Sequence, residues 1–410
     1  TNPDVCSGRG VCTGVDVCLC DPGYAGTYCE RAIRGITYAI GLQNYGQLGN
    51  DDLPAADGFA REILIVQGLL TRLKIKKVDG GQHFSVALAL NGDLYTWGYN
   101  NQGQLGVGDT ASRDRPIKVL SNVSDFCAGN GRVVAITNQG IKAWGIYATQ
   151  NTMIAAPTAI AFPNGDLPKT VACGALHTLV LSQNGFVYSF GGGAEGQLGF
   201  GLVSESWTIS KVLGLKNIAA VAAGDYHSMA LGIYGEVYTW GKNDNGQLAD
   251  KTTTNKHVPV LAYGQIMKEI ITKVGASIGS SYVVTSNGTI YSWGSNTNGL
   301  LGDSSVPVAG RRTPGLVQNL AGVKIISVFP SISNQWVTAI DESGAGYSWG
   351  INTKANLGDK TTDVRTQPVP QTVNMYYPTT KLEWVGAAHS HALLLLDDVM
   401  CFGVLANDPL

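Results

Sequence analysis

A pattern that recurs about every 50 residues constrains the fold of this chain more than any other feature. From residue 36 onward, short runs with strand character end in a small residue, an aromatic residue and glycine. The clear copies are Thr96-Trp97-Gly98, Ala143-Trp144-Gly145, Ser189-Phe190-Gly191, Thr239-Trp240-Gly241, Ser292-Trp293-Gly294 and Ser348-Trp349-Gly350. Degenerate copies lie near both ends, at Ala39-Ile40-Gly41 and Cys401-Phe402-Gly403. Successive glycines are 46 to 57 residues apart, which is the spacing of propeller blades.

Each repeat carries the same local signals in the same order. A β-rich run of the G-x-x-H type comes first, followed by a hairpin turn such as Asn184-Gly185, where glycine accepts a positive φ. The aromatic strand is next, and a glycine-rich turn such as Gly196-Gln197-Leu198-Gly199 follows it. An outer strand with a proline, such as 116–119, completes the unit. Runs of the G-x-x-H type lie near His83, Arg132, His177, His227, Tyr282, Trp336 and His389.

The G-Q-L-G turn and the Tyr-x-Trp-Gly strand resemble those of the regulator-of-chromosome-condensation propeller family, and the resemblance covers residues 36–410. It implies an all-β, seven-bladed propeller, with six blades built within the chain and the seventh from both ends, which hides the sheet edges. One terminal strand is then surplus, and the sequence leaves open which one is displaced. The stretches 51–72 and 304–311 are expected to be longer loops, and therefore contact surfaces.

The first 30 residues have a different composition. Five of the eight cysteines gather there, at Cys6, Cys12, Cys18, Cys20 and Cys29. The run resembles an epidermal-growth-factor-like module, above all where Cys18-Leu19-Cys20 precedes Asp21-Pro22-Gly23. The first of that family's six cysteines is absent, so the resemblance implies pairs Cys6–Cys18 and Cys20–Cys29, with Cys12 bonded to a cysteine upstream. Zinc is disfavoured because the run has no C-x-x-C pair and no histidine.

The expected organisation is therefore a module over 1–30, a linker over 31–35 and a propeller over 36–410. Clustered cysteines favour an oxidising compartment. Because the sequence starts at Thr1 and the module lacks a cysteine, we expect it to be cut from a longer, secreted precursor.

Three further cysteines and two sequons bear on this expectation. Cys127 and Cys173 lie in consecutive repeats, where a disulfide and two buried thiols both fit, and the state of Cys401 is open. Asn122-Val123-Ser124 and Asn287-Gly288-Thr289 are sequons, so in a secreted protein Asn122 and Asn287 are predicted glycosylation sites.

Charge and motif content argue against several functions. The chain has 28 basic and 30 acidic residues, which excludes the cationic face of a nucleic-acid binder. No apolar run reaches the roughly 18 residues of a membrane-spanning helix. The segment 275–279 matches G-x-S-x-G and 191–196 matches G-x-G-x-x-G, yet both fall in blade segments without a following helix.

The recurrent histidines do not predict a metal site. Packed sheets lie about 10 Å apart, so equivalent positions of neighbouring blades cannot share one ion. These histidines are instead expected to form hydrogen bonds between strands or blades. The lysines of 74–77 are interpreted as a solvated strand face. No catalytic residue, cofactor or metal is predicted.

The family's best-known member is a nuclear exchange factor for a small GTPase, a role that a disulfide-containing module disfavours. The sequence favours a non-enzymatic, secreted structural protein, a subunit of an extracellular filament or surface assembly such as a protist flagellar hair (mastigoneme). Its expected partners are copies of itself or other extracellular proteins, with no nucleic acid and no membrane span. The alternative is an extracellular protein- or glycan-binding propeller, for which Trp207 and Trp336 are candidate exposed aromatic residues.

Overall fold

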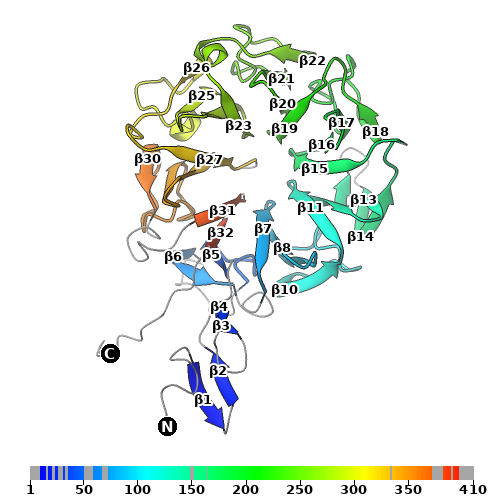
Figure 1. Ribbon diagram of the computed structural model, residues 1–410, viewed down its shortest axis with the longest axis vertical. Coiled ribbons are helices and arrows are strands. Elements are labelled where there is room, and N and C mark those ends of the chain that lie inside the picture. Colours follow the sequence, from blue (N-terminus) through cyan, green and yellow to red (C-terminus); the bar gives the residue numbers. More distant parts are fainter. Residues whose placement is uncertain are drawn as a thin grey trace.

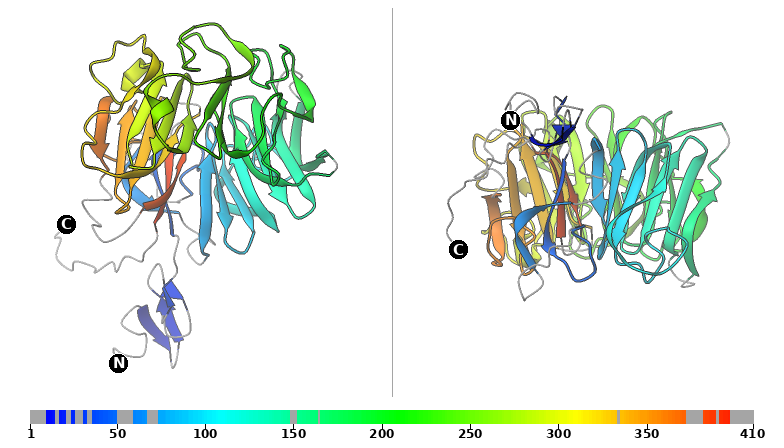
Figure 2. Two further views of the ribbon diagram at one scale, coloured as in Figure 1. Left: turned by 45° about the horizontal axis from the view of Figure 1, so that its top comes forward. Right: turned by 90° about the horizontal axis from the view of Figure 1, so that it is seen from below.

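The computed structural model is a propeller of seven four-stranded antiparallel blades around a central axis (Figure 1). It describes residues 10–14, 17–20, 24–25, 31–32, 36–49, 59–66, 73–147, 152–163, 165–332, 335–371, 382–388 and 391–396. Seen from the side, the blades form a short, wide cylinder (Figure 2). The predicted all-β, seven-bladed architecture is confirmed.

Six blades are continuous in sequence. Blade 1 contains β7 (Ile75–Gly80), β8 (Phe84–Ala89), β9 (Leu94–Gly98) and β10 (Arg113–Leu120). Blade 2 contains β11 (Val123–Ala128), β12 (Arg132–Thr137), β13 (Gly140–Tyr147) and β14 (Thr152–Ile160). Blade 3 contains β15 (Pro168–Cys173), β16 (His177–Ser182), β17 (Val187–Gly191) and β18 (Ser206–Lys211).

The next three blades follow the same order from the axis outward. Blade 4 contains β19 (Ile218–Ala223), β20 (His227–Gly232), β21 (Val237–Gly241) and β22 (Lys256–Leu261). Blade 5 contains β23 (Ile271–Ala276), β24 (Ser280–Thr285), β25 (Ile290–Gly294) and β26 (Arg311–Leu316). Blade 6 contains β27 (Ile325–Pro330), β28 (Trp336–Asp341), β29 (Gly346–Gly350) and β30 (Arg365–Pro370). Short 3-10 turns, η3 (Gln265–Lys268) and η4 (Thr297–Gly299), lie between strands.

Blade 7 joins the two ends of the propeller, as predicted. Its strand order is β31 (Leu382–Ala387), β32 (His391–Leu396), β5 (Ile36–Leu42) and β6 (Phe59–Ile65). The strand that contains Ala39-Ile40-Gly41 therefore takes the place of the aromatic strand, whereas 401–403 lie outside the described residues. The stretch 51–72 was expected to be a loop, but it contains β6, the outer strand of this blade.

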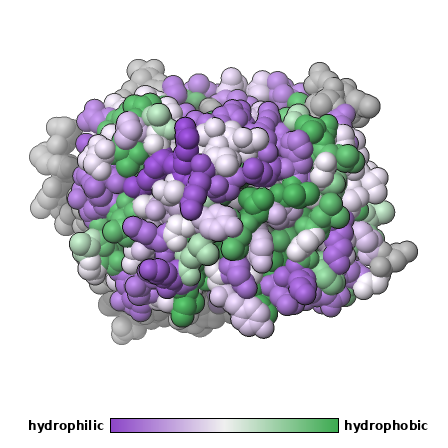
Figure 3. Space-filling view, turned by 90° about the horizontal axis from the view of Figure 1, so that it is seen from above, coloured by the Kyte–Doolittle hydropathy of each residue, from purple (hydrophilic) through white to green (hydrophobic). Residues whose placement is uncertain are grey.

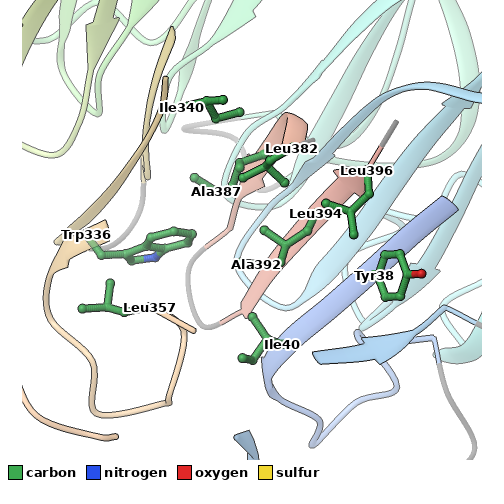
Figure 4. Close-up of a cluster of buried hydrophobic side chains, with 11 residues drawn as sticks. Tyr38, Ile40, Trp336, Ile340, Leu357, Leu382, Ala387, Ala392, Leu394 and Leu396 are labelled. Atoms are coloured by element: carbon green, nitrogen blue, oxygen red, sulfur yellow. The ribbon is translucent and has the colours of Figure 1, made fainter. Parts of the chain in front are cut away.

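Hydrophobic side chains fill the space between neighbouring blades. At the joint of blades 6 and 7, Trp336 and Leu357 face Ile40, Ala392 and Leu394, and all five are buried (Figure 4). Similar clusters occupy the other joints, so each blade buries its faces only against its neighbours. Such packing makes the propeller a rigid support for whatever its two faces carry.

The glycine of the small–aromatic–Gly motif is required by its backbone. At Gly241 φ is +97°, and a Cβ atom would lie 2.5 Å from the carbonyl oxygen of Tyr226, the residue just before the adjacent strand β20. The glycines of the five other clear copies also have positive φ and the same kind of close carbonyl contact. At or near its end, the third strand thus adopts a conformation that only glycine adopts without strain.

The outer strands are protected against pairing with other sheets. Proline occurs within five of them, as Pro116, Pro157, Pro259, Pro314 and Pro368. Proline cannot donate to a ladder and is typical of sheet edges. Figure 3 looks onto the edge at the top of Figure 1, where β21, β22 and β26 lie, and shows apolar patches between polar side chains. Contacts at this rim therefore depend on side chains rather than on strand addition.

Two short hairpins precede the propeller. The strand β1 (Gly10–Gly14) pairs with β2 (Val17–Cys20), and β3 (Tyr24–Ala25) pairs with β4 (Arg31–Ala32). Cys6 and Cys29 lie outside the described residues, as do the side chains of the other cysteines in this segment. The disulfide pairs inferred for the module therefore stay predictions.

Candidate functional site

The blades are held together by a relay of hydrogen bonds that begins at a buried histidine. His177 Nε2 of blade 3 lies 2.9 Å from Ser228 Oγ of blade 4. That hydroxyl donates to the carbonyl oxygen of Gln197, 2.8 Å away in the G-Q-L-G turn of blade 3. Trp240 Nε1 of blade 4 donates to the same carbonyl at 2.8 Å. Recurrent histidine, tryptophan and G-Q-L-G signals thus describe one joint between two blades.

The relay recurs at two more joints, which confirms the expected bond between blades for His177 and His227, whereas His389 lies outside the described residues and His391 takes its expected place. His227 Nε2 lies 2.9 Å from Ser281 Oγ, and His391 Nε2 lies 2.7 Å from Ser85 Oγ. Each serine donates to the glutamine carbonyl of the preceding blade's turn. Burial lowers the pKa of both His227 and His177 to about 3, and the nearby Arg132 guanidinium adds to the shift of His177.

The other runs of this type differ in register or residue. Phe84, not His83, opposes the motif glycine in blade 1, and Ser280, not Tyr282, does so in blade 5. In blade 2 the guanidinium of Arg132 donates to the His177 carbonyl of blade 3. Trp336 is fully buried and donates to the Ala388 carbonyl at 2.9 Å, so it is not an exposed aromatic residue.

We call the side where the second and third strands of each blade meet the hairpin face, and the opposite side the turn face. An aromatic cluster that the sequence did not reveal lies on the turn face between blades 7 and 1. The ring centroids of Tyr45 and Tyr99 are 4.3 Å apart, and His83 lies 5.3 Å from Tyr45. Tyr45 is exposed, whereas Trp207, the other predicted aromatic candidate, is half-buried in a hydrophobic cluster.

The inner strands enclose a central channel of about 300 Å³. Cys127 of β11 and Cys173 of β15 lie in its wall and form a disulfide, with their Cα atoms 5.4 Å apart. Of the two arrangements that the sequence left open, the structure has the disulfide. It links blades 2 and 3 covalently next to the axis, where the inner strands of all blades converge (Figure 1).

A half-buried ion pair lies beside the channel, with Lys77 in the channel wall. Lys77 Nζ is 2.7 Å from Asp125 Oδ1, and the other oxygen of Asp125 accepts from Thr170 and from the Val171 amide of blade 3. Burial alone would raise the pKa of Asp125, but Lys77 and these donors hold it below its usual range. The 74–77 run is therefore not a wholly solvated face, because Lys77 serves to join blades 1 and 2.

Asp225 is a buried carboxylate in the turn between β19 and β20. Its Oδ1 atom has no hydrogen-bond partner, and burial raises its pKa to about 7 although Lys242 opposes the shift. The carboxyl group is therefore partly protonated at neutral pH, which makes the stability of this turn depend on pH.

The two sequence motifs that match a nucleophile elbow and a dinucleotide-binding loop lie in ordinary blade segments. Ser277 is fully buried between β23 and β24, so 275–279 forms a strand–turn–strand unit rather than a nucleophile elbow. Gly191 ends β17, and 193–196 form a turn rather than the start of a helix. Within the described ranges there is no cluster of three potential metal ligands, and no helix there is long and apolar enough to cross a bilayer.

Both sequon asparagines are exposed on the hairpin face. Asn122 adjoins the β8–β9 hairpin, where the Val123 amide donates to the Gly92 carbonyl, and Asn287 lies at the tip between β24 and β25. Their modification stays a prediction.

Comparison with known proteins agrees with this architecture. The regulator of chromosome condensation (RCC1) repeat model matches residues 91–136, 184–231, 234–284 and 287–329. A second model of the repeat matches 75–104, 169–197, 218–247 and 271–300. A Teneurin-like EGF domain model matches residues 3–32.

Proteins similar to this chain include a human ubiquitin ligase, a plant receptor and a yeast protein. The human E3 ubiquitin-protein ligase HERC2 is 30% identical over 326 residues, or 75% of this chain, yet the chain spans only 7% of HERC2. The Arabidopsis thaliana ultraviolet-B receptor UVR8 is 27% identical over 367 residues, which cover 83% of this chain and 80% of the receptor. Prp20p of Saccharomyces cerevisiae, whose structure was described with its binding to Gsp1p and histones, superposes with a TM-score of 0.77 at 20% identity, over 90% of this chain and 92% of Prp20p.

Proposed function

Because the chain belongs to the regulator of chromosome condensation (RCC1) repeat family, we propose that it is a non-enzymatic propeller that binds other proteins outside the cell, as a subunit of an extracellular filament or surface assembly. The observation that carries the extracellular part is the Cys127–Cys173 disulfide between blades 2 and 3. Structural disulfides persist in oxidising compartments and are rare in the cytosol and nucleus. The N-terminal match to a Teneurin-like EGF domain agrees with such a compartment.

Protein binding is supported by the scaffold and by a relative. A propeller has a rigid core, and the loops on its two faces can vary without disturbing the blades. Prp20p, which has the same fold, binds Gsp1p and histones according to its structural description. Charged residues make up only 14% of the present chain, so extensive contacts would desolvate few charges.

A filament is the more specific form of the proposal, with a mastigoneme as one example. Repeated head-to-tail contacts between copies produce filaments when the rotation does not close. Proline in five outer strands disfavours assembly by strand addition, so we infer that the subunits would meet through side chains on the faces or the rim.

A glycan-binding propeller is the second candidate, favoured by the aromatic cluster of Tyr45, Tyr99 and His83. Exposed aromatic rings offer flat apolar surface with polar tips, which suits sugar rings as well as peptides. Its test is a glycan array probed with the wild type and with Tyr45→Ala.

The primary test uses native source material. Antibodies against the propeller are applied to intact cells, followed by negative-stain electron microscopy, and the thiols of the isolated protein are counted before and after reduction. We expect surface or filament labelling and an oxidised Cys127–Cys173 pair. Labelling that requires permeabilised cells, together with free thiols at both positions, would overturn the extracellular assignment.

A further inference from the structure

The hairpin face of blades 4 and 5 carries an apolar surface that we call the Tyr234 patch, formed by Ile233, Tyr234, Met267 and Ile270. Tyr234 is 79% exposed and Ile270 is 67% exposed, and the other two side chains are also more than half exposed. Gly235 of the β20–β21 hairpin lies against Glu269–Ile271, so the two segments form one surface. Such contiguous exposure of large apolar side chains is typical of interaction sites.

The repeat itself shows that this surface is not required by the fold. The equivalent hairpin tips of blades 2, 3, 5 and 6 carry polar pairs, Asn138-Gln139, Gln183-Asn184, Ser286-Asn287 and Glu342-Ser343. Blade 1 carries one apolar residue at its tip, in Leu90-Asn91, whereas blade 4 carries two, Ile233-Tyr234. Met267 comes from η3, a turn inserted between β22 and β23 that the described parts of the other blade connections lack.

A small cleft of about 150 Å³ opens within the patch. Tyr234 and Met267 line its mouth, and Leu261, Ala262 and Ile266 line it further in. The volume suits one medium-sized apolar side chain. A partner that inserts such an anchor would bury it against five apolar residues, the arrangement found at the centres of binding interfaces.

Two carboxylates give the edge of the cleft a negative charge. Glu236 and Glu269 are half-buried in its lining. Glu269 accepts a hydrogen bond from Tyr291 at 3.4 Å, and no lysine or arginine in the described part of the chain forms an ion pair with either glutamate. Cations are therefore the complementary groups for the edge of this cleft.

We propose that the Tyr234 patch binds an extended segment of another protein, in which an apolar side chain that enters the cleft is followed or preceded by Lys or Arg. This inference deepens the proposed protein-binding function and rests on it. The basic residue pairs with Glu236 or Glu269, and the chain on either side of the anchor covers Ile233 and Ile270. A second copy of the propeller and a glycan on Asn287 are the competing occupants, the latter because the Ser286 amide donates to the Ile270 carbonyl.

The test uses the purified full chain and a random peptide library displayed on phage. The variant Ile233→Gln/Tyr234→Asn copies the hairpin tip of blade 3 and should fold, which the melting temperature checks. The matched control is Leu90→Asn, because Leu90 is 64% exposed at the equivalent tip of blade 1. Enriched peptides are synthesised, and their dissociation constants for each variant are measured by calorimetry.

We expect enriched peptides to share an apolar residue beside Lys or Arg. Their affinity should fall about tenfold or more in the double variant Ile233→Gln/Tyr234→Asn, which we call the blade 3 copy. It should fall by a smaller factor in Glu236→Gln and not at all in Leu90→Asn. Binding should weaken with salt in the wild type and less so in Glu236→Gln.

Three results would overturn the inference: enrichment without a basic residue, equal binding to the blade 3 copy, or dimers that the same copy abolishes. Peptides that bind only after Asn287→Gln, in protein from the native source, would show that a glycan covers the patch instead. Because this assay uses isolated protein, it can succeed when surface labelling fails, and the reverse also holds.

Discussion

His227 and Ser281 belong to neighbouring blades, and a hydrogen bond of 2.9 Å joins Nε2 of the histidine to Oγ of the serine. The Ser281 hydroxyl has one proton and donates it to the Gln247 carbonyl, 2.8 Å away. The hydroxyl oxygen therefore accepts the hydrogen bond from His227. His227 is therefore the Nε2–H tautomer, and its Nδ1 atom, which has no hydrogen-bond partner, carries no proton. A second proton would be buried without an acceptor, which explains why the pKa of His227 is low.

Removing the serine hydroxyl should weaken the joint between blades 4 and 5. In Ser281→Ala, the Nε2–H group of His227 stays buried without an acceptor, which costs about 1–3 kcal/mol of unfolding free energy. Denaturant unfolding measures the loss. Ser286→Ala changes an exposed serine of the next hairpin and should leave the unfolding midpoint unaltered. Equal midpoints for the two variants would contradict a structural role for the relay.

Acid should destabilise the propeller through its buried histidines. Their folded pKa of about 3 lies below the unfolded value of 6.5, so only the unfolded chain takes up protons as pH falls through this window. Stability is complete above pH 6.5 and is lost towards pH 3, by about 2 kcal/mol per histidine at pH 5. Melting curves of the wild type and of His227→Gln test this, and the variant should show the shallower acid dependence.

Protonation of Asp225 has the opposite effect on stability, because acid stabilises the folded state through this group. Its folded pKa of about 7 lies above the ordinary aspartate value of 3.8, so the folded state gains a proton as pH falls from 8 towards 4 and is stabilised relative to the unfolded state. Asp225→Asn should therefore stabilise the protein at pH 8, where the wild-type carboxylate is buried and charged, and this advantage should shrink by pH 5. An advantage that does not change with pH would show that Asp225 is ionised throughout.

The channel disulfide should contribute substantially to stability. Cys127 and Cys173 are 46 residues apart in sequence, a loop for which chain-entropy arguments give about 4 kcal/mol. Cys127→Ala/Cys173→Ala should lower the denaturation midpoint accordingly. Reductant should lower the midpoint of the wild type more than that of the variant, which lacks this bond. A variant as stable as the wild type would show that blade packing alone fixes this joint.

The motif glycine should tolerate no side chain. Gly241→Ala introduces a Cβ 2.5 Å from a backbone carbonyl and places alanine at a φ of +97°, so we expect a loss of more than about 2 kcal/mol. Gly214 has a φ of +73° with no atom within 4 Å of a Cβ, so Gly214→Ala isolates the conformational part, about 1 kcal/mol. The difference between the two unfolding midpoints measures the clash.

The repeated elements were predictable because each motif has one structural task. The motif glycines mark strand ends, and closure by both ends follows from a count of strands. Register was less certain: Gly80 and Gly81 are adjacent, so the sequence could not show that Phe84, rather than His83, takes the histidine position. The strand β6 has no aromatic–glycine signal and was expected to be a loop.

Features that depart from the repeat were harder to predict than the repeat itself. Lys77 appeared solvated because its partner, Asp125, lies 48 residues away in another blade. Tyr45 and Tyr99 come together only because blade 7 closes beside blade 1. The Tyr234 patch likewise combines a hairpin tip with a turn from the following connection, a juxtaposition that no single motif describes.

Closure of blade 7 sets an order of events during synthesis. Gly41 pairs with His391, so the third strand of that blade leaves the ribosome 350 residues before its partner, 391 minus 41. At 5–20 residues per second, β5 waits roughly 20–70 s with an unsatisfied edge. Substitutions that weaken the pairing of β5 with β32 should therefore reduce the yield of folded protein, because β5 lacks this partner until synthesis is almost complete.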